Sequence, residues 1–167
     1  SILSKEPCRS FDADRDGLNL GEAAAYLVLE AEEVSYHKKK YCKISGYGNA
    51  CDAYHASALS EDAIGMKTAI YTALAKANLD ASQIDFIHTH GTATLNNDLV
   101  ESRGMKYVFK EKMPPFISTK TYTGHTLGAA GAVATIYTAL ALTNQEIYPS
   151  LNFSTPTEEG LVPNTSY

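Results

Sequence analysis

The stretch STKTYTGHTLGAAGA, Ser118–Ala132, brings a lysine and a histidine together between a predicted strand and a predicted helix. The segment PPFISTK, residues 114–120, predicts a strand after its two prolines, so Lys120 comes at the strand's end. The segment GAAGAVATIYTALALTNQ, residues 128–145, predicts a helix that His125 precedes. Its small residues allow close packing against a neighbour or close approach of a ligand. This segment is therefore one candidate site.

A long uncharged stretch, Leu127–Leu142, lies within the same region. It is rich in alanine and is interrupted by Gly128 and Gly131. A membrane span needs about 20 consecutive apolar residues, and this run falls short of that length. We therefore expect a tightly packed internal helix and no membrane partner.

Strand-like and helix-like segments alternate along the rest of the chain, which predicts an α/β fold with a mostly buried sheet. A length of 167 residues suits one domain with a sizeable core. The predicted strands are residues 23–31, 41–50, 83–90 and 114–120, and the clearest helices are residues 60–79, 96–110 and 128–145.

Composition narrows the function classes. The formal net charge of −5 argues against a general nucleic-acid binder. The three cysteines, Cys8, Cys42 and Cys51, are odd in number and show no CxxC spacing, which fits a reducing compartment better than a disulfide framework. We therefore expect a cytoplasmic protein.

The acidic segment that begins at Phe11 resembles the start of an EF-hand calcium loop. Asp12, Asp14 and Asp16 alternate, and Gly17 follows them. An EF-hand needs a bidentate carboxylate at its twelfth position, which here is Ala23, and a methyl group cannot bind a hard cation. We therefore expect no metal site, but an acidic turn that leads into a buried strand at residues 23–31.

A second candidate motif is HTHGTAT, His88–Thr94, at the end of the strand predicted at residues 83–90. Reactive groups in α/β folds lie at such strand ends. Gly91 allows a tight turn, and Thr92 and Thr94 offer hydroxyl groups. Taken singly, each histidine or lysine is more often structural or solvated than catalytic, but two histidines and a lysine at neighbouring strand ends favour a functional site.

These motifs resemble the C-terminal half of a β-ketoacyl-acyl-carrier-protein synthase, closest to the elongating type II enzymes. The similar segments are FDADRDGLNLGEAA, CDAYH, HGTAT with the acidic residues that follow it, and STKTYTGHTLGAAGAV. The resemblance implies a thiolase-like fold, in which two similar halves each carry a mixed five-stranded sheet covered by helices. On this resemblance, residues 1–40 are the tail of the first half, and residues 41–167 are the second half without its final strands.

The resemblance also implies a chemistry, namely decarboxylative Claisen condensation of an acyl thioester with malonyl-acyl-carrier protein in fatty-acid or polyketide-like biosynthesis. It assigns catalytic roles to His90, His125 and Lys120, pantetheine binding to Thr92 and Thr94, and support of Lys120 to Asp98 and Glu101. It implies no cofactor beyond the phosphopantetheine of acyl-carrier protein. The partners that it implies are acyl-carrier protein and, because the full-length protein is expected to be a homodimer, a second copy of that protein. The family's nucleophilic cysteine matches none of the three cysteines, so the chain alone is expected to be inactive.

Two other functions stay open at this stage. A chain-length-factor-like subunit shares the fold and pairs with a true synthase, although the retained His90, Lys120 and His125 count against it. A stand-alone binding module is the third possibility. One departure from the family pattern is Ala134, where a glutamate is usual, and this residue weakens the polar network expected around Lys120.

Overall fold

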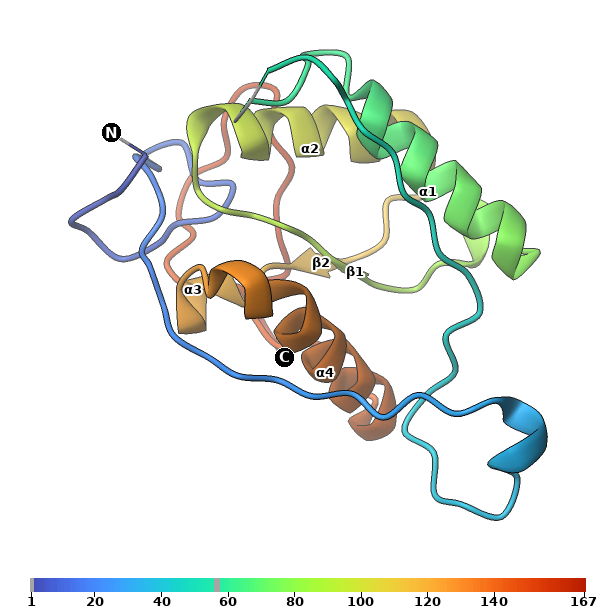
Figure 1. Ribbon diagram of the computed structural model, residues 1–167. Coiled ribbons are helices and arrows are strands. Elements are labelled where there is room, and N and C mark those ends of the chain that lie inside the picture. Colours follow the sequence, from blue (N-terminus) through green and yellow to red (C-terminus); the bar gives the residue numbers. More distant parts are fainter. Residues whose placement is uncertain (1, 56–57) are drawn as a thin grey trace.

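The computed structural model describes residues 2–55 and 58–167 and has an α/β architecture (Figure 1). Ser1, which begins the expected first-half tail, lies outside the described residues. The α/β class expected from the sequence is confirmed. In chain order, the elements are η1 (Glu32–Val34), α1 (Ile64–Ala77), η2 (Ala81–Gln83), β1 (Ile87–His88), α2 (Leu95–Phe109), β2 (Phe116–Ile117), α3 (Lys120–Thr123), η3 (Leu127–Ala129) and α4 (Ala130–Asn144).

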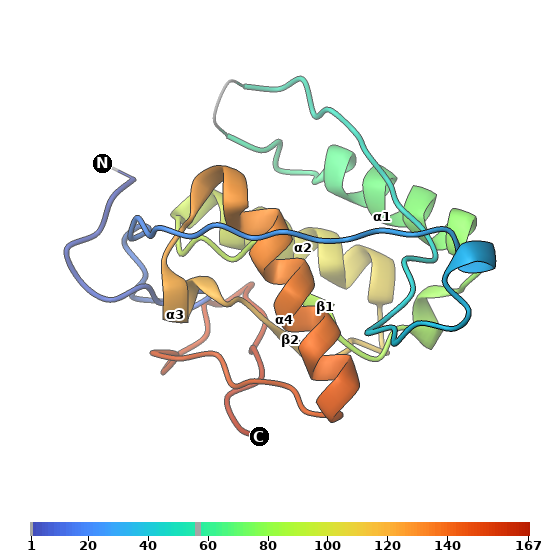
Figure 2. The same ribbon diagram turned by 60° about the horizontal axis from the view of Figure 1, so that its bottom comes forward.

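The sheet is smaller than the mixed five-stranded sheet that the resemblance implied. In the described chain, β1 and β2 form one parallel pair, with Ile87 opposite Phe116 and His88 opposite Ile117. Helices α1 and α2 lie on one side of the pair and α4 lies on the other (Figures 1 and 2). The parallel arrangement brings the carboxyl ends of both strands to one edge, and the residues of both candidate motifs follow there.

The prediction of a buried strand at residues 23–31 is wrong. This segment forms no ladder with the described residues, and Tyr26 and Val28 are each 89% exposed. It runs as an extended chain across α4 (Figure 2). A strand is stable only when neighbouring strands satisfy its backbone groups, and local sequence pattern does not supply such neighbours.

The strand predicted at residues 41–50 is also absent. This segment instead lies close to α1 without pairing as a strand. A Cβ atom added to Gly48 would lie 1.8 Å from the carbonyl oxygen of Ala69, and one added to Gly46 would lie 2.2 Å from that of Ala73. The two glycines therefore allow a close approach of backbone to helix that larger residues would block.

Helix α4 differs from the tightly packed internal helix expected from its composition. Ala141 is its one residue classed as buried, and added Cβ atoms at Gly128 and Gly131 would meet open space. A hollow of about 880 Å³ separates part of α4 from residues 26–44. By length and mean hydropathy alone, Leu127–Asn144 is a candidate membrane span, a weak criterion that core helices of soluble proteins also meet.

The hydrophobic core lies between the strand pair and helices α1 and α2. Its buried members are Phe11, Met105, Val108, Phe109 and Phe116. The rings of Phe11 and Phe116 meet edge to face, with centroids 5.0 Å apart. Phe11 thus anchors the acidic turn in the core. This anchor places the turn close to the carboxyl end of β2.

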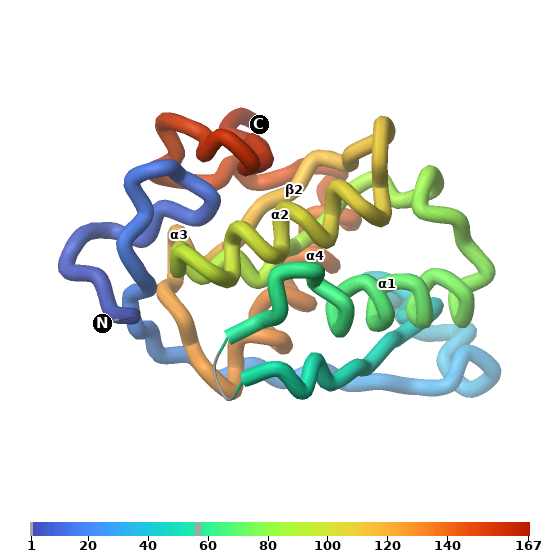
Figure 3. The backbone as a smooth tube through the Cα atoms, turned by 90° about the horizontal axis from the view of Figure 1, so that it is seen from above, coloured from blue at the N-terminus to red at the C-terminus, as the bar shows by residue number. Residues whose placement is uncertain are grey.

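The acidic turn binds the chain's own backbone. The carboxylate of Asp12, which is fully buried, accepts hydrogen bonds from the amides of Asp14, Ser154 and Thr155 at 2.6–2.9 Å and from the Ser154 hydroxyl at 3.0 Å. Burial raises the pKa of Asp12, but these hydrogen bonds outweigh burial and leave that pKa below its usual value. Asp12 therefore joins the acidic turn to the C-terminal segment. Figure 3 shows the blue N-terminal part of the chain beside the red C-terminal part.

We expect Asp12→Ala to lower the free energy of unfolding by about 3 kcal/mol, because it leaves buried amide donors unpaired. Urea denaturation measures this change, and Asp14→Ala, at an exposed position, is the matched control. Millimolar calcium should leave the melting temperature of the unmodified protein unchanged. A saturable stabilisation by calcium that Asp12→Ala abolishes would contradict this assignment.

Candidate active site

The loop after β1 is shaped by Gly91. Its φ of +44° lies in the left-handed region, and an added Cβ atom would lie 2.5 Å from Cβ of Ser118. The carbonyl oxygen of Gly91 accepts hydrogen bonds from the hydroxyls of Ser10 at 2.5 Å and Ser118 at 3.1 Å. Glycine is therefore required here for conformation and for space, and the turn places His90 beside the end of β2.

The structure brings His90 and His125 together. Their ring centroids are 5.3 Å apart, and the rings are nearly perpendicular at 86°. His125 follows α3 and is held through its backbone, since its amide donates to the carbonyl of Asn19 at 2.7 Å and its carbonyl accepts from the amide of Gly21 at 3.1 Å. The N-terminal segment around Asn19 and Gly21 thus positions the second histidine.

Both imidazoles have an acceptor role at Nδ1. The amide of Leu127 donates to Nδ1 of His125 at 3.0 Å. The ammonium of Lys120, which has only donors, lies 3.3 Å from Nδ1 of His90. In a neutral imidazole one nitrogen accepts and the other carries the proton. Each histidine therefore carries its N–H at Nε2.

The electrostatic surroundings keep the two imidazoles neutral. Loss of hydration, followed by the charges of Lys120 and His125, lowers the pKa of His90 to about 4, although His90 as a whole residue is exposed. Burial and then Lys120 also lower the pKa of His125. At neutral pH both rings are therefore uncharged hydrogen-bond donors.

Lys120 begins α3 and is 7% exposed. Its ammonium donates to the carbonyl oxygen of His90 at 2.6 Å. Burial lowers the pKa of Lys120, and the ionisable groups of Glu101, Cys8 and Asp98 oppose that change. Among the described residues no ion pair joins Lys120 to Asp98 or Glu101, so the expectation that these carboxylates hold the lysine directly is corrected.

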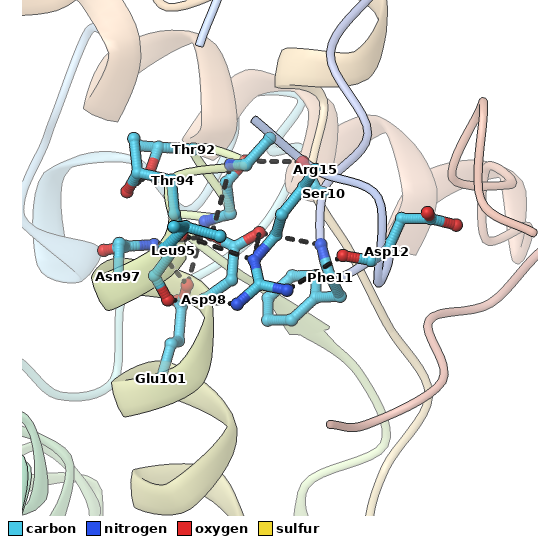
Figure 4. A network of polar contacts seen from close by, with 12 residues as sticks. Ser10, Phe11, Asp12, Arg15, Thr92, Thr94, Leu95, Asn97, Asp98 and Glu101 are labelled. Carbon is cyan, nitrogen blue, oxygen red and sulfur yellow. Dashed lines mark hydrogen bonds and ion pairs between the residues drawn. The ribbon is translucent and has the colours of Figure 1, made fainter. Parts of the chain in front are cut away.

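The two carboxylates instead hold backbone amides of the loop (Figure 4). Glu101 accepts from the amides of His90 at 2.7 Å and Gly91 at 2.8 Å, and burial raises its pKa to about 7. Asp98 accepts from the amides of Phe11 at 2.7 Å and Ala93 at 3.2 Å. The motif spacing did not reveal these bonds, because the amides come from segments that pack beside α2 only in the fold.

Thr92 and Thr94 lie next to each other at the start of α2. Their hydroxyl oxygens are 2.9 Å apart, and Thr94 is the N-cap residue of the helix. His88 lies outside this cluster. Its Nε2 is hydrogen-bonded to the hydroxyl of Thr119 at 3.0 Å. This contact gives His88 a structural role.

Sequence reasoning missed several residues that shape the site. They come from the acidic turn, from the start of α2 and from the end of β2, namely Ser10, Phe11, Arg15, Asn97 and Ser118. The only signal for Phe11 and Arg15 was their place in FDADRDG, which indicated a structural segment, and Ser10 directly precedes it. Their contacts with the loop depend on the fold.

The cysteines do not join the histidine pair. Cys8 is buried with Sγ 3.7 Å from Oγ of Ser10, and burial raises the pKa of its thiol. Cys42 and Cys51 are exposed. Within residues 2–55 and 58–167, no group of three or more histidine, cysteine or acidic residues is arranged to hold a metal ion.

A family model described as "Beta-ketoacyl synthase, C-terminal domain" matches residues 41–154. The chain belongs to the beta-ketoacyl synthase family. The recognition made from the motifs is therefore confirmed. The division into residues 1–40 and 41–167 stays a prediction.

Named members of the ketosynthase family show how much of such a protein this chain represents. The chain is 40% identical to 3-oxoacyl-[acyl-carrier-protein] synthase 2 of Vibrio harveyi, an alignment that covers 95% of this chain and 40% of that protein. It is 39% identical to a putative polyketide beta-ketoacyl synthase 1 of Streptomyces cyaneus, over 90% of this chain and 37% of that one. The chain thus spans about 40% of the length of these curated relatives.

Solved ketosynthase structures agree with the fold described above. A beta-ketoacyl synthase from Burkholderia phymatum STM815 superposes with a TM-score of 0.84 at 37% identity, over 92% of this chain and 37% of that chain. The ishigamide ketosynthase/chain length factor gives a TM-score of 0.91 at 34% identity, over 98% of this chain and 41% of that chain. The partial thiolase-like fold of this chain is therefore established as that of the ketosynthase C-terminal region.

We expect stability to fall as pH is lowered from 7 to 4, in part through His88. Burial lowers the pKa of His88 from 6.5 to about 4. Across that window the unfolded chain binds a proton that the folded chain does not, and the difference contributes about 3 kcal/mol. His88→Gln should remove this contribution from the pH profile of urea unfolding.

The comparison of pH profiles isolates His88, because the other shifted groups are present in both proteins, His90 titrating in the same sense and Glu101 in the opposite sense. Its pKa is raised to about 7, so its contribution is lost as pH rises. The control is His37→Gln at an exposed position. Equal profiles for His88→Gln and the unmodified protein would show that the buried ring does not resist protonation.

Proposed function

We propose that this chain carries the oxyanion half of a 3-oxoacyl-[acyl-carrier-protein] synthase. The reaction is decarboxylative Claisen condensation of an acyl thioester with malonyl-acyl-carrier protein. The observation that carries the proposal is the convergence of His90 and His125, 5.3 Å apart between ring centroids. Both rings accept at Nδ1, so both direct an Nε2–H donor from a neutral imidazole.

The proposed chemistry needs two such donors. The bond between the malonyl carboxyl carbon and the adjacent CH₂ carbon breaks, carbon dioxide leaves, and the electron pair forms an enolate of the thioester. Negative charge accumulates on the thioester oxygen, and preorganised donors aimed at that oxygen lower the barrier. The enolate carbon then attacks the acyl thioester carbonyl, and the thiolate leaves. Neutral histidines suit the first step because they donate without requiring a proton transfer.

Lys120 supports the donor state of His90. Its ammonium holds the carbonyl oxygen and Nδ1 of His90, and its charge is one cause of the lowered pKa of both site histidines. Lysine here therefore maintains the neutral Nε2–H form of His90. Substituting Lys120 would change the acidity and orientation of that ring.

The substrate partner in this proposal is acyl-carrier protein. Thr92 and Thr94 present two adjacent hydroxyls beside His90, and we assign to them hydrogen bonds with the phosphopantetheine arm. One similar solved structure is described as a type II PKS acyl-carrier protein in complex with its ketosynthase, AntDE:AntF, with 31% identity and a TM-score of 0.90. A cytoplasmic location and a homodimeric complete protein belong to the same proposal.

A chain-length-factor-like subunit is the second candidate. It is favoured by similarity to structures described as ketosynthase with chain length factor. A non-catalytic partner has no need for two donors held as Nε2–H, and here separate backbone and lysine contacts fix both. The histidine geometry therefore favours the synthase. Whether the pathway makes fatty acids or polyketides follows from neither candidate, since relatives of both kinds have about 40% identity.

We expect His90→Ala and His125→Ala each to reduce decarboxylation of malonyl-acyl-carrier protein by about 100-fold in the complete gene product, the usual effect of removing one oxyanion donor. Self-acylation by an acyl thioester should fall less. Carbon dioxide release and acyl-enzyme formation are measured separately, with His37→Ala as control. Residues 1–167 alone should neither condense nor acylate, because none of their cysteines matches the family's nucleophile.

Two results would contradict the proposal. Decarboxylation that survives both substitutions would remove the role given to the histidines. A complete gene product that folds, binds its subunit partner and never decarboxylates malonyl thioester would favour the chain-length-factor alternative.

A further inference from the structure

Two buried residues of the site have an unusual backbone conformation, and the same carboxylate holds both. Phe11 has a φ of 67° and Ala93 a φ of 63°, a region that residues with a side chain rarely occupy. Both amides donate to Asp98, at 2.7 and 3.2 Å. Ala93 lies between Thr92 and Thr94, so its conformation sets the spacing of the two hydroxyls.

Arg15 holds the same loop from the other side. Its side chain is 6% exposed, and Nε lies 3.9 Å from the carboxylate of Asp98. Nη2 donates to the carbonyl oxygen of Leu95 at 3.0 Å, and Nε contacts that of Thr94 at 3.4 Å. Nη1 donates to the carbonyl of Asp12 at 2.9 Å, which ties the guanidinium to the acidic turn (Figure 4).

We propose that Arg15 is a positioning residue that fixes the hydroxyls of Thr92 and Thr94 for the pantetheine arm of the substrate. Arg15 does not contact the reacting atoms. It acts by holding the carbonyls on the α2 side of the loop while Asp98 holds the amide of Ala93. The inference rests on the proposed function and adds a determinant of substrate affinity on the first-half tail.

The geometry requires arginine rather than any cation. A guanidinium presents donors in a rigid planar fork, and here the fork reaches three separate carbonyl groups. An ammonium is a single flexible point charge and cannot reach all three. Arg15→Lys therefore keeps a positive charge near Asp98 and removes the fork, which makes it a sharper variant than Arg15→Ala.

The kinetic test compares Arg15→Lys with the unmodified complete gene product. The hydroxyls contact a non-reacting part of the substrate, so their displacement weakens ground-state and transition-state binding alike. We expect KM for malonyl-acyl-carrier protein to rise about tenfold while kcat for decarboxylation stays within about threefold. Arg103→Lys is the matched control, because Arg103 lies on α2 and pairs at the surface with Glu159.

A purely structural role predicts a different result. Arg15→Lys would then lower the melting temperature and the active fraction, so kcat would fall while KM stayed constant. The double variant adds a second criterion. In a Thr94→Val background, which has already lost one hydroxyl of the pair, Arg15→Lys should raise KM by much less than in the unmodified protein. Additive effects on KM would overturn the proposal.

Hydrogen exchange tests positioning without any reaction. The peptide that contains Ala93 should exchange about tenfold faster in Arg15→Lys, because the loop around the Ala93 amide is then no longer held in place. The same peptide should be unchanged in Arg103→Lys. Absence of decarboxylation in the unmodified protein would refute the proposed function, and exchange would still decide whether Arg15 orders the loop. Unchanged exchange and unchanged KM together would overturn the inference.

Discussion

Two buried carboxylates on the first turns of α2 accept hydrogen bonds from backbone amides, and the geometry of the site depends on this arrangement. Asp98 holds the amides of Phe11 and Ala93, and Glu101 holds those of His90 and Gly91. A buried carboxylate without such partners would be strongly destabilising. Because the amides belong to the loop that carries His90, satisfying the charges also fixes the histidine.

The arrangement leaves Lys120 free to act on His90. If the carboxylates were its direct partners, its ammonium would point to α2. Instead it donates to the carbonyl of His90 and lies beside Nδ1 of the same ring. A buried cation next to an imidazole opposes protonation of that ring. Lys120 thus adds to the effect of burial in lowering the pKa of His90 and also fixes its donor at Nε2, and both contacts form with alanine at position 134.

Part of the fold and of the site could be predicted from the local sequence. Helices α1, α2 and α4 follow from their residue patterns, and the motifs located His90, Lys120 and His125, because each lies next to a strand or helix that the chain encodes locally. The strand expected at residues 23–31 failed because pairing depends on a neighbour, and the described chain provides none. The roles of Arg15 and Asp98 were missed for a related reason, since their partners lie about 80 positions away in sequence.

The bond between Asp12 and Ser154 spans 142 positions of sequence, which has a consequence for how the protein folds. Contacts between distant segments form late, because long loops must close first and topologies rich in such contacts fold slowly. During synthesis, Phe11 is able to reach Asp98 as soon as α2 has emerged, whereas the partners of Asp12 at residues 154 and 155 are made later. The contacts of the acidic turn with α2 therefore have the shorter loop to close, and its contacts with the C-terminal segment have the longer one.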